Sequence, residues 1–89
     1  MAKIVKAASA GTMESSDAFV EIAPGTNGIE FELESVVKAQ FGESIRAVVL
    51  DVLDKCGVKD ADIRVVDRGA LECVLRARVE TAVQRGGEK

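Results

Sequence analysis

The chain has 89 residues and a net charge of −3, with 47% apolar and 30% charged residues. This composition excludes a disordered chain, and the length predicts a single domain, 1–89, with one modest core. The acidic balance argues against a nucleic-acid partner, and the absence of His together with only two Cys argues against a metal site.

Neither a membrane span nor a secretory signal is predicted. No apolar run approaches the roughly 20 residues that a spanning helix needs, and residues 1–8 are too charged for a signal sequence. We therefore expect a cytoplasmic protein with no membrane partner. Its two cysteines are expected to be reduced and packed in or near the core.

The first third of the chain indicates strands separated by turns. Residues 1–10 are weakly patterned and are expected to form an edge strand or a flexible arm, and residues 11–17 are small, polar and typical of a hairpin tip. Residues 18–23 predict a strand that Pro24 ends. Residues 29–34 alternate Ile, Phe and Leu with three Glu, which predicts a half-exposed antiparallel strand. These two strands are predicted to pair as a hairpin.

The rest of the chain predicts two helices around one further strand. Ser35 is expected to cap a helix that ends at Gly57, although Gly42 inside the pattern leaves a start near 42–43 as the alternative. Residues 62–66 predict a strand, and Asp67 is expected to cap the last helix. That helix is expected to carry an apolar stripe from Leu71 to Val83 and to end at the glycine pair 86–87, leaving 86–89 as a polar tail.

The predicted order is (β)ββαβα, and the predicted class is α+β. A small antiparallel or mixed sheet of three to four strands, with two helices packed on one face, buries both helical stripes.

The turn contains the most exposed nucleophiles, Ser15 and Ser16, flanked by Glu14 and Asp17. A hydrolase would need a base beside the serine, and the chain has no His. Two acids on a polar turn are more typical of solvated side chains than of a catalytic pair. The residues alone therefore indicate a module without catalytic residues that is held by a partner or carries something.

Three stretches extend this interpretation: AGTMESSD at 10–17, QFGESIR at 40–46 and DRGALECVLRAR at 67–78. Together, in this order and spacing, they closely resemble the acyl carrier protein of citrate lyase, its gamma chain. The Asp-Ser-Leu signature of four-helix-bundle acyl carriers is absent, so the resemblance implies a different fold that is not a four-helix bundle.

The resemblance implies a non-catalytic, cytoplasmic subunit that carries 2'-(5''-phosphoribosyl)-3'-dephospho-CoA through a serine phosphodiester. The matching serine is Ser15, with Ser16 as its rival, and Glu14 and Asp17 are expected to help the prosthetic-group transferase recognise the site. The implied partners are the alpha subunit, an acyl transferase that exchanges acetyl for citryl, and the beta subunit, a lyase that cleaves the citryl thioester to oxaloacetate.

Two alternatives remain open from the sequence. One is the related carrier subunit of malonate decarboxylase, with the same prosthetic group and different partners. The other is an interaction domain that shares the fold and carries no cofactor.

Overall fold

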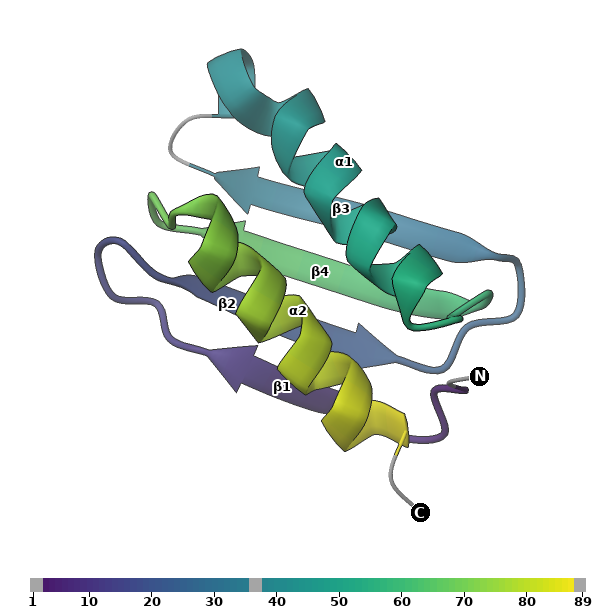
Figure 1. The fold of residues 1–89 in the computed structure, drawn as a ribbon. Coiled ribbons are helices and arrows are strands. Elements are labelled where there is room, and N and C mark those ends of the chain that lie inside the picture. Colours follow the sequence, from purple (N-terminus) through teal and green to yellow (C-terminus); the bar gives the residue numbers. More distant parts are fainter. Residues whose placement is uncertain (1–2, 36–37, 88–89) are drawn as a thin grey trace.

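Two helices cover one face of a four-stranded sheet (Figure 1). The computed structural model describes residues 3–35 and 38–87. In chain order the elements are β1 (Ala8–Gly11), β2 (Ala18–Ala23), β3 (Ile29–Ser35), α1 (Lys38–Lys55), β4 (Ala61–Asp67) and α2 (Glu72–Gly87). The predicted α+β class is confirmed, and the fold is not a helical bundle.

The sheet has the order β1-β2-β4-β3, so the predicted hairpin between residues 18–23 and 29–34 is wrong. β4 lies between β2 and β3, antiparallel to the first and parallel to the second. β4 exposes only Asp62, whereas β3 exposes three glutamates and is better suited to an edge. The chain does reverse at residues 24–28, but β3 pairs with β4 and not with β2. α1 connects β3 to β4 and provides the crossover that a parallel pair of strands requires.

α1 begins at Lys38, and the predicted cap at Ser35 is wrong. Ser35 is the last residue of β3, and its Oγ donates to Asp67 Oδ2 at 2.9 Å. The helix continues through Gly42, so the alternative start near 42–43 is also wrong. That alternative treats residues 36–41 as a lead-in, of which 36–37 lie outside the described residues and 38–41 belong to α1. The stop at Gly57 is confirmed, because the helix ends at Lys55 and Gly57 has a φ of +75°.

α2 begins after Leu71 and runs through the glycine pair predicted as its end. Leu71 is 71% exposed, so it does not belong to the apolar stripe. Cys73 is exposed rather than packed near the core.

Gly86 is buried, so it belongs to the helix and not to a polar tail. Its carbonyl accepts bonds from the backbone N–H groups of Val5 and Lys6, which brings the N-terminal segment across the end of α2.

The core lies between the sheet and the helices. Its largest fully buried side chains on this side come from β2, β4, α1 and α2, namely Val20, Ile22, Val65, Val49, Leu53 and Val79. Full burial of one such aliphatic side chain stabilises the fold by about 1.5–3 kcal/mol. This layer holds the sheet ends, and the turns next to them, in fixed positions.

Candidate functional site

The turn between β1 and β2 lies at the same end of the sheet as the β4–α2 loop and the start of α1 (Figure 1). Gly11, the last residue of β1, has a positive φ of +95°, and Ser16 within the turn has a positive φ of +66°. The backbone N–H of Ser16 donates to the carbonyl of Arg68 at 2.8 Å, and that of Arg68 donates to the carbonyl of Asp17 at 2.9 Å. These two backbone bonds therefore continue the β2–β4 pairing into the second half of the turn.

Asp17 anchors the turn to the body of the domain. Its Oδ1 accepts from Arg78 Nε at 2.9 Å and from the Ala18 N–H at 2.7 Å. Its Oδ2 accepts from Arg78 Nη2 at 2.8 Å and from Thr12 Oγ1 at 2.7 Å. Arg78 is on α2, and this bidentate pair is the geometry in which Arg binds a carboxylate best.

The contacts of Asp17 also decide its charge. The hydrogen bonds from Arg78, with those from Thr12 and Ala18, hold the pKa of the Asp17 carboxyl well below its ordinary range. The same carboxylate raises the pKa of Arg78. With only 14% of its side chain exposed, Asp17 remains an ionised and largely covered part of the turn.

The two predicted attachment residues are both exposed, and they differ in how the backbone holds them. Ser16 is held by its bond to Arg68, whereas Ser15 lies one residue earlier, between Glu14 and that anchor. Among the described residues, neither serine hydroxyl forms a hydrogen bond. The structure thus brings Glu14, Ser15, Ser16 and Asp17 together on one turn, as predicted.

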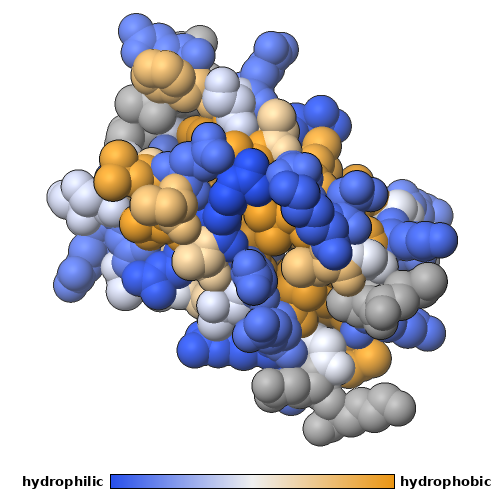
Figure 2. Space-filling model, in the orientation of Figure 1, coloured by the Kyte–Doolittle hydropathy of each residue, from blue (hydrophilic) through white to orange (hydrophobic). Residues whose placement is uncertain are grey.

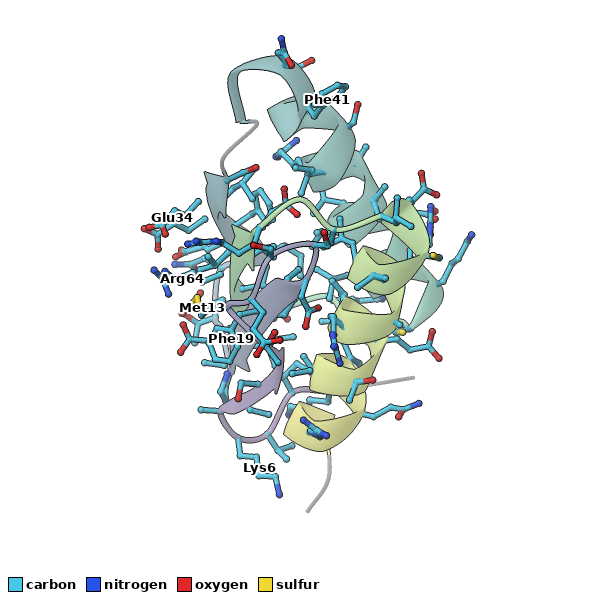
Figure 3. All side chains as sticks on the ribbon, turned by 90° about the vertical axis from the view of Figure 1, so that its left-hand side faces the viewer. Lys6, Met13, Phe19, Glu34, Phe41 and Arg64 are labelled. Atoms are coloured by element: carbon cyan, nitrogen blue, oxygen red, sulfur yellow. The ribbon has the colours of Figure 1, made fainter. Side chains whose placement is uncertain are left out.

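An apolar groove of about 350 Å³ lies between the start of α1 and the β4–α2 loop. Phe41, Ile45, Val48, Ala70 and Leu75 contribute most of its apolar lining. Phe41 is 52% exposed, and Figure 3 shows it at one end of the molecule. Hydrophobic side chains reach the surface between hydrophilic ones on this helix-covered face (Figure 2). The groove was not predicted from the sequence, because its walls come from segments about 30 residues apart.

Asp67 is a buried residue that lines the apolar groove. It is 3% exposed, and its two oxygens accept from Ser35 Oγ and from the Ala70 N–H, at 2.9 and 3.0 Å. The predicted cap of the last helix at Asp67 is wrong, because α2 begins at Glu72 and the N–H that Asp67 accepts belongs to Ala70, which lies before the helix. Asp67 also joins the ends of β3 and β4, which the sequence did not predict.

The face of the sheet opposite the helices is acidic. Arg64 lies between Glu21 and Glu34, at N–O distances of 2.8 and 3.8 Å. Figure 3 shows Phe19, Glu34 and Arg64 on the side of the sheet away from α2. In the described part of the chain, no group of three His, Cys, Asp or Glu residues is arranged to hold a metal ion. The same residues contain no helix that is long and apolar enough to cross a membrane.

The fold and the turn define a small α+β domain that presents serine hydroxyls on an anchored loop. A profile of the family described as "Malonate decarboxylase delta subunit (MdcD)", an acyl carrier protein family, matches residues 5–86. The chain belongs to this family.

Two relatives are close in sequence. The chain is 53% identical over 88 residues to citrate lyase acyl carrier protein 2 of Salmonella typhimurium, a match that covers 98% of this chain and 91% of the relative. It is also 53% identical over 83 residues to the citrate lyase acyl carrier protein of Weissella paramesenteroides, covering 93% and 86%. The resemblance drawn from the three sequence stretches is confirmed.

One solved structure shares the fold. A chain of a Pseudomonas malonate decarboxylase hetero-tetramer in complex with malonate aligns with a TM-score of 0.82 at 21% identity, covering 98% of this chain and 93% of that one. Membership of the acyl carrier family implies a covalently attached prosthetic group and a non-catalytic carrier role within a multi-subunit complex.

Proposed function

We propose that this chain is the acyl carrier subunit of a cytoplasmic citrate lyase and that Ser15 carries its prosthetic group. The observation that supports the proposal most strongly is the 53% identity, over 88 residues, with a protein named citrate lyase acyl carrier protein. Covalent attachment needs a hydroxyl that a transferase can reach, and Ser15 is exposed on a turn.

The proposed group is 2'-(5''-phosphoribosyl)-3'-dephospho-CoA, joined to the serine through a phosphodiester. When bound, it supplies a thiol on which acetyl and citryl groups are held. The residues of the turn suit such a group on two counts. The hydroxyl of Ser15 is unobstructed, and the Arg78 guanidinium neutralises the nearby Asp17 carboxylate, which would otherwise repel the phosphate.

The contribution of the chain itself is to position a tethered substrate. A group attached to Ser15 reaches the alpha and beta subunits in turn without dissociating, at the high effective concentration of an intramolecular encounter. The Asp17–Arg78 pair and the Ser16–Arg68 bond fix the starting point of the tether relative to the domain surface. Acyl exchange and citryl cleavage are assigned to those partner subunits.

Glu14 and Asp17 have different proposed roles in loading. Both oxygens of Asp17 are occupied by Arg78, Thr12 and Ala18, so Asp17 acts by holding the turn. Glu14 is exposed and available to the prosthetic-group transferase. Normal loading rates for both Glu14→Gln and Asp17→Asn would contradict any role of these acids in recognition.

The second candidate is the carrier subunit of malonate decarboxylase. It is supported by the description of the matching family and by the shared fold of the Pseudomonas chain. The sequence identity of 21% with that chain, against 53% with the citrate lyase relatives, favours citrate lyase. Reconstitution with the alpha and beta subunits of each enzyme distinguishes the two, because only the cognate complex would turn over its substrate.

The test of the main proposal is intact mass and peptide mapping after co-expression with the enzymes that make and transfer the group. We expect an added mass that Ser15→Ala abolishes, while Ser44→Ala, which removes an exposed serine from α1, leaves it unchanged. Loss of the mass only in Ser16→Ala would keep the function and move the site by one residue. No added mass in any sample would refute the carrier role and favour an interaction domain that carries no cofactor.

A further inference from the structure

Arg68 is fixed directly beside the attachment turn. Its carbonyl accepts from the Ser16 N–H at 2.8 Å and its own N–H donates to the Asp17 carbonyl at 2.9 Å. Both backbone groups of Arg68 are thus bonded to the two residues after Ser15. The side chain of Arg68 is exposed, and in the described part of the chain it takes part in no ion pair or side-chain hydrogen bond.

The charges of the turn make this arginine distinctive. Of the two acids, Asp17 is already paired with Arg78, whose guanidinium is used in the bidentate contact. Glu14 is exposed and unpaired among the described residues. Unlike Arg78, Arg68 therefore has guanidinium N–H groups that no carboxylate of the described residues binds.

We propose that Arg68 binds the phosphate joined to Ser15 and holds the first segment of the attached group against the β4–α2 loop. The inference rests on the proposed attachment at Ser15. A guanidinium presents several N–H donors in a plane and binds phosphate oxygens through two parallel hydrogen bonds, which a Lys ammonium does not reproduce. The backbone bonds to Ser16 and Asp17 keep the root of the side chain in place, so binding has to order the side-chain torsions but not the backbone.

The experiment compares Arg68→Gln and Arg68→Lys with Arg46→Gln in the full-length chain. Arg46 is also an exposed arginine with no ion pair among the described residues, but it lies on α1 beside Phe31 and Leu33 of β3, so Arg46→Gln makes the same change in net charge elsewhere. The first readout is loading by the transferase. We expect the KM for the carrier to rise about two- to tenfold in Arg68→Gln, with partial recovery in Arg68→Lys and no change in Arg46→Gln. The rise should shrink at high salt, because the contact is exposed.

The second readout uses loaded protein and does not depend on activity. In the wild type, loading should shift the Nε–Hε resonance of Arg68, and Arg68→Gln should move the phosphorus resonance of the serine phosphodiester while Arg46→Gln does not. Thermal unfolding checks that every variant is folded, which we expect since the side chain of Arg68 makes no contact that the fold needs.

Two results would overturn the proposal. One is equal KM values and equal phosphorus resonances for Arg68→Gln and Arg46→Gln. The other is a raised KM with an unchanged phosphorus resonance, which would mean that Arg68 contacts the transferase and not the phosphate. Neither result would touch the carrier function, whose failure is recognised separately by a wild-type chain that acquires no added mass.

Discussion

Gly11 is the last residue of β1, at the base of the β1–β2 turn, and Gly11→Ala should destabilise the protein strongly. Its φ of +95° lies in a region that costs an L-residue about 1–3 kcal/mol. A Cβ at this position would also overlap the carbonyl oxygen of Ala18, which is backbone and cannot rotate away, and it would crowd the Arg78 side chain. Forced shifts of this kind cost about 1–3 kcal/mol more.

The expected loss for Gly11→Ala is therefore about 2–6 kcal/mol. For a domain of this size, each kcal/mol corresponds to about 4–8 °C in Tm, so the midpoint should fall by at least about 8 °C. Far-UV circular dichroism during heating measures it. Gly28→Ala is the matched control, because Gly28 has a φ of +77° with open space around its Cβ position and isolates the cost of φ alone.

Gly28→Ala should lower the free energy of unfolding by about 1 kcal/mol. The cost of the positive φ is partly offset, because Ala reduces the conformational entropy of the unfolded chain. Equal Tm values for Gly11→Ala and Gly28→Ala would refute the reasoning. They would show that the turn relaxes around the added methyl group and that its contact with Ala18 does not define it.

Two further predictions concern titratable groups. Because the folded pKa of Asp17 is lowered, its ionisation should stabilise the fold in full above its ordinary pKa of 3.8 and lose that contribution as the pH falls below it. Urea unfolding at pH 7 and pH 5 should therefore give the same difference between wild type and Asp17→Asn, and a smaller one at pH 3. Arg78→Gln should not add to Asp17→Asn, and additive losses would contradict a single paired contact. Burial, with a smaller contribution from the charge of Glu80, raises the pKa of the Cys56 thiol, whereas Cys73 is exposed. Iodoacetamide at pH 8 should therefore label Cys73 first, and peptide mapping that finds equal rates would contradict the burial of Cys56.

Local patterns in the sequence were sufficient for the elements themselves. Alternation of Ile, Phe and Leu with Glu predicted β3, and apolar residues at helical spacing predicted α1 and α2. The composition of residues 11–17 predicted the turn, although Gly11 is the last residue of β1, and it predicted the serines as the exposed nucleophiles. Each of these features depends on residues within a few positions of one another, where side-chain period and backbone preference act directly.

Strand order and the anchoring of the turn depended on contacts between distant segments. β4 lies between β2 and β3, where it is almost fully buried and pairs with a strand on each side. The sequence of β2 or β3 alone does not indicate this position of β4. Asp17 binds Arg78, which is 61 residues away in the sequence, and Asp67 binds Ser35, which is 32 residues away. Both contacts form only when the folded chain brings these segments together. The sequence by itself determined the α+β class and the turn with its exposed serines. Tertiary structure decided which strand lies at the centre, which acid is neutralised and which arginine is bonded to the β1–β2 turn. These features depend on the free energy of long-range packing and not on local preference.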